Sequence, residues 1–358
     1  MKILYGVQGT GNGHLSRARS MSKHLNNTSF EVDFLFSGRD REKYFDMECF
    51  GNWQCKRGLT FITDKGKIKP LATLQQVRAG ELMRDIKTLP VIDYDLIISD
   101  YEPVTAWAAH RAKRPCLGIG HQYAFNHKIP LKGDNAATRL IMNRFAPTSH
   151  NLGLHWYHFD APILPPIIDH WEANGPINAN KVIVYLPFED PAFVTRLLTE
   201  FHDFQFYYFG NFQQVETQDN IHFNPVSREK FQLALADAAG VICNAGFELA
   251  SESIHMGKKI LVKPLLGQME QVSNALALQE LELGRAVDRL TIDNIRDWLE
   301  NFQAKQVTYP DVAEHIVAWL QQGKLDDQQD LIEELWAKTN ANGLTTFKPL
   351  LQLKAAAA

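Results

Sequence analysis

Short apolar strand patterns alternate with helical patterns along both halves of this 358-residue chain. Strand patterns at 2–7 and 94–99 precede helical segments in the first half, and those at 181–186 and 240–243 do so in the second. Strands that alternate with helices favour βαβ units and parallel sheets. The chain is also too long for one ordinary core. The sequence therefore predicts an α/β protein with two Rossmann-like parallel-sheet domains.

A connection rich in proline and glycine separates the two series. It begins at Pro162, Pro165 and Pro166 and continues through HWEANGPINAN. Such punctuation is typical of a domain boundary. We expect an N-terminal domain at 1–163, a linker at 164–180, a C-terminal domain at 181–322 and closing helices at 323–358.

The composition is that of a globular protein, with 45% hydrophobic and 22% charged residues. No apolar run approaches the roughly 20 residues that a membrane span needs, and the start does not resemble a signal peptide. The four cysteines match neither metal-ligand spacing nor a disulfide framework, which predicts reduced thiols in the cytoplasm.

Charge is distributed unevenly between the two halves. Residues 1–163 carry a net charge of +7 and the remainder carries −11. The basic half suits an anionic acceptor or peripheral contact with the acidic inner face of a membrane, although ordinary solvated surface explains it equally well. No nucleic-acid-binding motif accompanies the charge, so nucleic acid is not an expected partner. The basic residues in question are Lys56, Arg57, Lys65, Lys67, Lys69, Arg111, Lys113 and Arg114.

The stretch from 240 to 275 has the layout of a ligand site. A strand leads into the turn Asn244–Ala245–Gly246 and then into a helix that begins at Phe247. Gly246 lets a ligand approach the backbone, and the free N–H groups of the next helix favour an anion such as a pyrophosphate. Glu248 and Glu252 share one face of that helix. A plain αβ unit with a solvated Glu face is the alternative.

The following loop supplies further polar groups at a helix start. Gln268 precedes the adjacent pair Glu270 and Gln271, whose side chains can accept from and donate to a sugar. Together with the glycine turn and Glu252, this ordered set favours a binding site over a chance arrangement.

A second glycine turn follows the first strand of the chain. Its glycines, Gly9, Gly11 and Gly13, do not match the G-x-G-x-x-G spacing of dinucleotide binding. His14 comes directly after them, in the first turn of the expected helix. The positive end of the helix dipole disfavours imidazolium there and favours a neutral base. A capping or packing histidine is the alternative.

Two carboxylates follow the strand pattern at 94–99. Because the carboxyl ends of parallel strands carry ligands in open α/β sheets, Asp100 and Glu102 are candidate site residues. Asp100 is placed to orient His14, or to cap the helix expected at 104–113.

The segment NAGFELASE resembles the donor-sugar signature of GT-B glycosyltransferases, both the UDP-sugar group and the peptidoglycan GlcNAc-transferase group, family 28. Gly246 matches the motif glycine, Phe247 its aromatic residue and Glu252 the ribose-binding Glu. Glu270–Gln271 matches the pair that contacts the donor sugar. Asn244, Glu248 and Leu249 depart from the pattern of the UDP-sugar enzymes.

The segment GTGNGHLSRA is similar to the N-terminal glycine loop of the same enzymes, in which His14 would lie near the acceptor hydroxyl. The resemblance implies two domains facing across a cleft and closing helices that return towards the N-terminal domain. It also implies an inverting transfer from a nucleotide sugar, with His14 as base, Asp100 behind it, and no metal or other cofactor. Gly11 and Gly13 would lie on the donor side, and Glu102, His121 and Gln122 on the acceptor side.

Two other classes of protein remain open from the sequence. A UDP-sugar 2-epimerase has the same scaffold and would act on the nucleotide sugar without an acceptor. A non-catalytic protein would bind the nucleotide sugar without transferring it.

Overall fold

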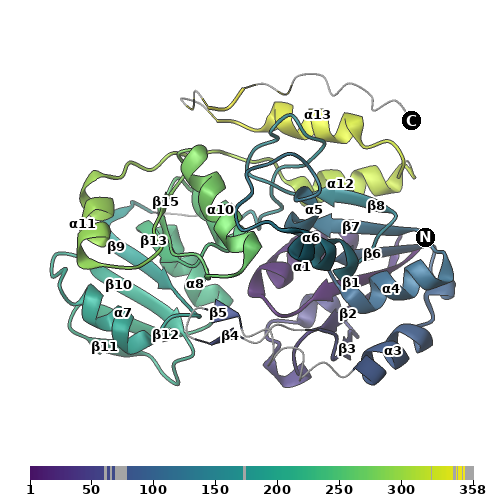
Figure 1. Cartoon of the computed structure of the whole chain (residues 1–358), viewed down its shortest axis with the longest axis horizontal. Helices are drawn as coiled ribbons and strands as arrows, with labels where there is room; N and C mark the ends of the chain where they lie inside the picture. The colour runs from purple at the N-terminus through teal and green to yellow at the C-terminus, as the bar shows by residue number, and fades with distance from the viewer. Residues whose placement is uncertain are drawn as a thin grey trace.

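The computed structural model describes residues 1–59, 63–64, 67–68, 79–171, 175–323, 325–341, 344, 346–348 and 350. Two sheets lie side by side, the N-terminal one on the right of Figure 1 and the C-terminal one on the left. This arrangement confirms the predicted α/β class with a parallel sheet in each half.

The N-terminal sheet has six parallel strands in the order β3-β2-β1-β6-β7-β8. Its central strands are buried throughout because helices cover both faces, as parallel sheets require. The strands are β1 (Lys2–Gln8), β2 (Glu31–Ser37), β3 (Gln54–Lys56), β6 (Leu96–Asp100), β7 (Cys116–Gly120) and β8 (His150–Gly153).

The helices of this half follow the sequence pattern closely. A separate antiparallel pair, β4 (Thr63–Asp64) and β5 (Lys67–Ile68), lies between the two halves in Figure 1. The helices are α1 (Asn12–Leu25), α3 (Ala79–Thr88), α4 (Pro103–Ala112), α5 (His121–Ala124) and α6 (Ala136–Phe145), with single 3-10 turns at Arg41–Lys43, Glu48–Phe50 and Val91–Asp93.

The C-terminal sheet has seven strands in the order β11-β12-β10-β9-β13-β14-β15, parallel except for the edge strand β11. The strands are β9 (Asn178–Tyr185), β10 (Gln205–Gly210), β11 (Glu216–Gln218), β12 (Ile221–Pro225), β13 (Ala238–Cys243), β14 (Lys259–Val262) and β15 (Arg285–Ala286). The helices of this half are α7 (Pro191–Leu198), α8 (Arg228–Ala236), α9 (Phe247–His255), α10 (Met269–Glu280) and α11 (Ile292–Asn301).

The last two helices, α12 (Val312–Gln321) and α13 (Gln329–Lys338), lie over the N-terminal half in Figure 1. Asp311, which caps α12, lies 2.9 Å from the His24 ring at the end of α1. Trp336 of α13 donates from its indole nitrogen to the carbonyl of Ile163 at 2.7 Å. The chain therefore crosses from the C-terminal sheet back to the N-terminal one.

An aromatic cluster joins the two halves. The Phe247 ring of α9 stacks on the His121 ring with centroids 4.0 Å apart and 5° between the planes. Trp156 packs on the same Phe247 ring and donates from its indole nitrogen to the Ser251 hydroxyl at 2.8 Å. All four residues are buried, so this contact is continuous hydrophobic core rather than a hydrated interface.

Several local predictions differ from the structure. The apolar pattern at 152–159 predicts a strand, whereas the strand present is the shorter β8, which begins at His150. The sequence of 40–68 has no regular pattern, yet this region supplies the edge strand β3. Glu102, not Asp100, caps α4. The spacing of apolar residues at 71–89 predicts a helix, and α3 lies in this range. Residues 71–78, like Lys65 and Lys69, lie outside the described residues.

Candidate active site

His14 lies in the first turn of α1, directly after the glycine loop that ends β1. The N-cap of α1 is Gly11, and no side chain caps this helix. The His14 side chain is 14% exposed, so it reaches the surface between the two halves while most of it is packed. A Cβ atom built on Gly11 would have one neighbour within 4 Å, the His14 ring at 3.8 Å. The space beside Gly11 and His14 is therefore open.

Asp100, the last residue of β6, fixes the His14 ring. The Nδ1 atom of His14 lies 2.7 Å from Oδ1 of Asp100. Arg17 also approaches Nδ1, with its Nη2 atom at 2.9 Å. A carboxylate only accepts hydrogen bonds, so we assign the ring proton to Nδ1, with Asp100 as its acceptor. The Nε2 atom then carries the lone pair, and no described residue hydrogen-bonds to it.

Arg17 forms a bidentate ion pair with the same carboxylate. Its Nε atom donates to Oδ2 of Asp100 at 2.8 Å and its Nη2 atom to Oδ1 at 2.6 Å. Burial alone would raise the pKa of Asp100, but the Arg17 charge and His14 outweigh it and hold the pKa below the usual value. Asp100 is therefore a buried carboxylate that stays ionised.

The same guanidinium crosses to the other half of the protein. Its Nη1 atom donates to Oε1 of Glu248, in the first turn of α9. Both side chains are almost fully buried. Burial raises the pKa of Glu248 to about 8, against the effect of Arg17, and the neighbouring Asp100 and Glu252 add to the rise. Arg17 thus joins the His14–Asp100 pair to the helix of the predicted donor site.

The turn before α9 presents an open glycine. Gly246 is the N-cap of α9, no side chain caps it, and a Cβ built there meets no atom within 4 Å. Gly13, by contrast, abuts the same helix, because a Cβ there would lie 2.6 Å from Cγ of Glu248. The first turn of α1 therefore abuts the first turn of α9, and Gly246, just before α9, stands beside free space.

Glu252 lies one turn further along α9 and faces α1. Its Oε1 atom accepts from the Ser16 hydroxyl at 3.3 Å. Burial and the nearby Asp169 raise the pKa of Glu252 to about 7, although the side chain keeps partial exposure. Hydroxyl groups that donate to a buried carboxylate stabilise its ionised form, and the predicted contact with ribose would supply such donors.

The remaining turn residues are more deeply packed than Gly246. Asn244 and Ala245 are buried, and Phe247 belongs to the aromatic cluster between the halves. Asn244 donates to the carbonyl of Lys263 at 2.9 Å. The predicted donor contacts of these residues stay predictions, and Phe247 has a clear packing role.

The predicted residues around α10 differ in how far their side chains are exposed. Gln268 and Glu270 are partly exposed, and Glu270 accepts from the Gln122 amide at 3.2 Å across the two halves. Gln271 is buried, and its side-chain oxygen accepts from the Leu265 N–H at 2.8 Å, which fixes the loop before α10. Glu270 is therefore better placed than Gln271 to meet a ligand.

The residues predicted for the acceptor side are largely occupied within the protein. Glu102 is fully buried, and its carboxylate accepts from Ser37, from Thr105 and from backbone N–H groups of α4. His121 is buried, with Nδ1 2.8 Å from the Leu154 carbonyl and Nε2 2.6 Å from Oδ1 of Asn274. Gln122 is buried but keeps its oxygen unpartnered among the described residues. Of the three, only Gln122 has a polar atom available.

The helices around the site share one property. The three that carry most of the predicted residues, α1, α9 and α10, begin without a capping side chain. The helices α4, α6, α7, α8, α11 and α12 each have one, while α5 and α13 also begin without one. An uncapped N-terminus leaves N–H donors and a partial positive charge for an anion.

Some residues at the site were not predicted from the sequence. Arg39 and Tyr185 both hydrogen-bond to Asn12, so the glycine loop is held from the two halves at once. Asn274 joins the turn before α9 to His121. A polar residue that follows a strand can be recognised in the sequence as a candidate site residue. Its hydrogen-bond partners cannot, because they come from distant parts of the chain.

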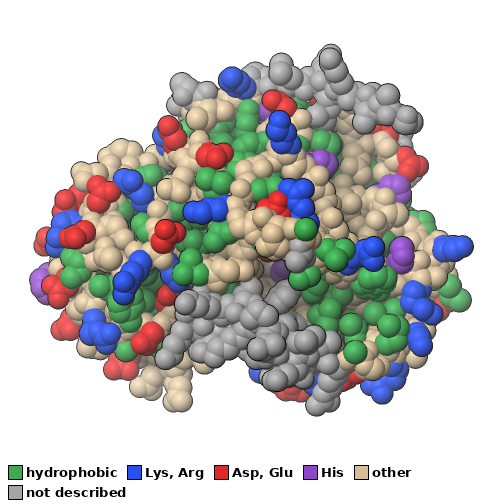
Figure 2. Space-filling model, viewed as in Figure 1, with side chains coloured by type: hydrophobic (Ala, Val, Ile, Leu, Met, Phe, Trp, Pro, Cys, Tyr) green, Lys and Arg blue, Asp and Glu red, His purple; other side chains and the backbone are tan. Residues whose placement is uncertain are grey.

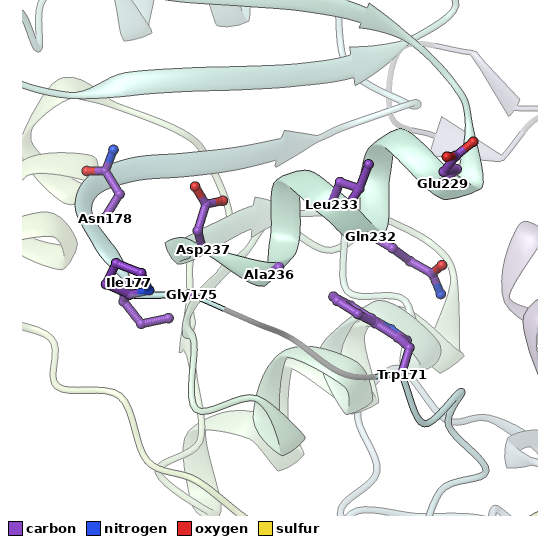
Figure 3. Close-up of a pocket in the computed structure, with 10 residues that line it drawn as sticks. Trp171, Gly175, Ile177, Asn178, Glu229, Gln232, Leu233, Ala236 and Asp237 are labelled. Carbon is purple, nitrogen blue, oxygen red and sulfur yellow. The ribbon is translucent and has the colours of Figure 1, made fainter.

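A surface hollow of about 700 Å³ lies elsewhere, between α8 and the start of β9 (Figure 3). Trp171 and Gln232 line it together with Asp237, and none of the predicted site residues does. Because it adjoins the start of β9, it lies at the edge of the sheet opposite to Asn244. Within the described ranges, no three His, Cys, Asp or Glu side chains form a metal cluster, and no helix is long and apolar enough to cross a membrane.

The two-sheet architecture and the site between the sheets define a glycosyltransferase of the GT-B type. The model of glycosyl transferase family 1 matches residues 1–303, and the chain belongs to this family. It is therefore an enzyme of the glycosyltransferase class.

Solved structures show the same fold at low sequence identity. The glycosyltransferase of kitacinnamycin superposes with a TM-score of 0.58 at 13% identity, covering 91% of this chain and 94% of that one. The calicheamicin glycosyltransferase superposes with a TM-score of 0.55 at 13% identity, covering 94% and 98%. A spinosyn rhamnosyltransferase, solved with thymidine diphosphate, superposes with a TM-score of 0.54 at 11% identity, covering 91% and 96%.

A curated relative has higher identity over a shorter length. An uncharacterised glycosyltransferase from Methanosarcina acetivorans is 31% identical over 139 residues. This match covers 37% of the present chain and 35% of the relative. The resemblance to the peptidoglycan GlcNAc-transferase group is not among these findings.

Proposed function

We propose that the protein is an inverting, metal-independent glycosyltransferase that moves a sugar from a nucleotide donor, UDP-linked, to a hydroxyl acceptor. The observation that carries the proposal is the contact between α1 and α9, the two helices that follow the glycine turns. The His14–Asp100 pair follows one turn, and the first turn of α9, with its open Gly246, follows the other. A base and an anion site therefore share one place between the halves.

The proposed reaction is a single displacement. The Nε2 atom of His14 takes the proton of the acceptor hydroxyl as its oxygen bonds to the anomeric carbon. The bond from that carbon to the phosphate oxygen breaks, and its electron pair leaves with the nucleoside diphosphate. Asp100 keeps the Nδ1 proton in place and stabilises the imidazolium that forms.

The leaving diphosphate gains negative charge in this step. The uncapped N-termini of α1 and α9 offer N–H donors and the positive ends of their dipoles to that charge. Thymidine diphosphate bound to the spinosyn enzyme of the same fold supports a nucleoside diphosphate here. Glu252 would accept from the ribose hydroxyls, and Gln268 and Glu270 would meet the sugar.

We further propose that the acceptor is a glycan, free or linked to lipid, met in the cytoplasm at the inner face of the membrane. On the N-terminal half, α6 exposes Leu140 and Ile141 between Arg139 and Arg144. Figure 2 shows hydrophobic side chains gathered on this half of the molecule, with Lys and Arg side chains at their edge. Apolar groups flanked by cations suit an anionic lipid surface.

The proposal is tested first with a panel of nucleotide sugars. Ligands that bind only the folded state raise the melting temperature, and we expect the largest rise with a UDP-sugar, with TDP-sugars as the comparison. Transfer to a hydroxyl acceptor is then followed by NMR, which reports the anomeric configuration of the product. A retained configuration contradicts the single displacement, and donor binding without transfer to any glycan contradicts the acceptor class.

Membrane contact is tested separately by sedimentation with vesicles. We expect binding to vesicles that contain anionic lipid and none to neutral vesicles, and weaker binding for L140E/I141E. Equal binding of the variant to anionic vesicles would remove α6 from the contact.

A further inference from the structure

Three polar residues lie after the carboxyl ends of neighbouring strands of the C-terminal sheet. Asn244 follows β13, Lys263 follows β14 beside it, and Glu189 lies four residues after β9 on the other side. The carboxyl ends of parallel strands meet at one edge of a sheet, and ligands of open α/β sheets bind there. This is the same edge that carries Gly246.

The three residues form one hydrogen-bonded group. Lys263 donates from Nζ to Oε1 of Glu189 at 2.6 Å. Asn244 donates to the Lys263 carbonyl at 2.9 Å and to the same Glu189 oxygen at 3.4 Å. The side chains of Lys263 and Glu189 are only 10% and 13% exposed. The group is thus held rigidly beside the turn that leads into α9.

The bonds within this group leave some polar atoms unsatisfied. An ammonium carries three protons, and among the described residues Lys263 gives one to a side chain, that of Glu189. The Asn244 side-chain oxygen is buried and has no donor in the described part of the chain. A polar atom left unpaired in the interior is costly, which points to a ligand that supplies the missing partners.

We propose that Lys263 binds the diphosphate of the nucleotide donor, with Glu189 and Asn244 positioning its ammonium. This assignment rests on the proposed function, since it names a side chain for the phosphate contacts that the helix N-termini would otherwise make alone. Phosphate oxygens accept the two Lys263 protons that no described side chain takes, and a hydroxyl group of the nucleotide donor donates to the Asn244 oxygen. The cation also stabilises the charge that the diphosphate gains as the glycosidic bond breaks.

A purely structural ion pair is the competing explanation, and the chain contains a matched example. Lys181 of β9 is buried to a similar degree and pairs with Asp237. That pair lies at the opposite edge of the same sheet, near the hollow of Figure 3. It therefore provides a control for the loss of a buried lysine away from the proposed site.

The test measures UDP binding by calorimetry for the wild type, Lys263→Gln, Glu189→Gln and Lys181→Gln. Lys263→Gln should weaken UDP binding about tenfold to 100-fold, the range for a charge-assisted hydrogen bond. Glu189→Gln keeps the ammonium and a side-chain oxygen that can position it, so it should weaken UDP binding clearly less than Lys263→Gln does. Lys181→Gln should bind like the wild type. Circular dichroism melting shows whether each variant is folded.

The outcomes separate this assignment from the proposed function. If the wild type binds UDP and folded Lys263→Gln binds it equally well, Lys263 has no role at the diphosphate. If Glu189→Gln loses as much affinity as Lys263→Gln, the ion pair is structural and the assignment is overturned. If the wild type binds neither UDP, TDP nor any nucleotide sugar, the proposed function fails and this assignment fails with it. Should Lys263→Gln not fold, Lys263→Arg, which keeps a cation able to bind phosphate, is tested instead, and a folded Lys263→Arg that no longer binds UDP overturns the assignment.

Discussion

The imidazole of His14 and the carboxylate of Asp100 lie 2.7 Å apart, although 86 residues separate them in the chain. Asp100 is fully buried, while the His14 side chain is 14% exposed. The carboxylate therefore fixes the inner ring nitrogen and leaves the outer one, Nε2, for a substrate. This relationship gives the ring one defined tautomer, which a general base needs.

Replacing the histidine tests this base. We expect His14→Ala to lower turnover by about 10²–10⁴-fold, the usual contribution of a positioned general base. Affinity for UDP should stay nearly intact, because the ring takes a proton from the acceptor rather than holding the nucleotide. Steady-state kinetics and calorimetry measure the two quantities, with the exposed His202→Ala as control. Wild-type turnover in His14→Ala would remove the residue from the mechanism.

Removing the charge of Asp100 should affect both folding and activity. Asp100→Asn leaves the Arg17 guanidinium buried with a weaker partner, and breaking a buried pair costs about 3–5 kcal/mol. Turnover should fall as well, since an amide does not hold the Nδ1 proton as a carboxylate does. Urea unfolding and kinetics check both effects. Asp95→Asn, exposed and directly before β6, keeps an oxygen that accepts from the Lys2 N–H and should match the wild type in each.

Gly246 offers a test that separates folding from binding. A Cβ there meets no atom within 4 Å and φ is −74°, so Gly246→Ala should cost about 1 kcal/mol of stability or less. The same methyl group would stand where the donor diphosphate is proposed to approach the backbone. We therefore expect clearly weaker UDP binding by calorimetry. Gly80→Ala, also in open space but on α3, is the control. Equal UDP affinities of the two variants would show that the diphosphate does not approach Gly246.

Replacing Glu252 should weaken nucleotide binding rather than folding. Loss of a hydrogen bond to a charged group costs about 1.5–3 kcal/mol, so Glu252→Ala should bind UDP about ten- to 100-fold more weakly. Calorimetry with UDP and 2′-deoxy-UDP measures this. The variant should lose most of the preference for the ribonucleotide that the wild type shows. Glu280→Gln, exposed at the end of α10, should bind both as the wild type does.

The buried Glu248 predicts a pH dependence of stability. Its pKa in the folded protein is about 8, well above the value of about 4.3 for an exposed Glu in the unfolded chain. At a pH between these two pKa values, Glu248 is protonated in the folded state and ionised in the unfolded state. The free energy of unfolding should therefore fall as the pH rises from about 5 to about 8. Glu248→Gln, which keeps an acceptor for Arg17, should flatten this fall in urea titrations. An unchanged slope would contradict the raised pKa.

Local sequence signals predicted much of the fold. The apolar strand patterns at 2–7 and 240–243 correspond to β1 and the end of β13, because burial on both faces of a parallel sheet requires continuous apolar residues. The glycine turns before α1 and α9 were also visible, since a glycine between a strand and a helix is a local signal. The pairing of His14 with Asp100 followed from their expected positions at one edge of one sheet.

The roles of single polar residues were harder to predict. Glu102 follows a strand, as Asp100 does, yet it caps α4 and is fully buried. His121 was placed on the acceptor side, whereas its ring stacks on Phe247 inside the contact between the halves. A side chain at a strand end points either into the protein or towards a ligand, and the sequence pattern is the same in both cases.

The sequence by itself determined the alternating strands and helices, the two glycine turns and the GT-B glycosyltransferase class, because these depend on residues close together in the chain. The tertiary structure alone decided that Arg17 reaches Glu248 across 231 residues and that Lys263 meets Glu189 across 74. The physical reason is that a buried charge requires a partner of opposite sign, and which partner lies within reach depends on how the two sheets pack together.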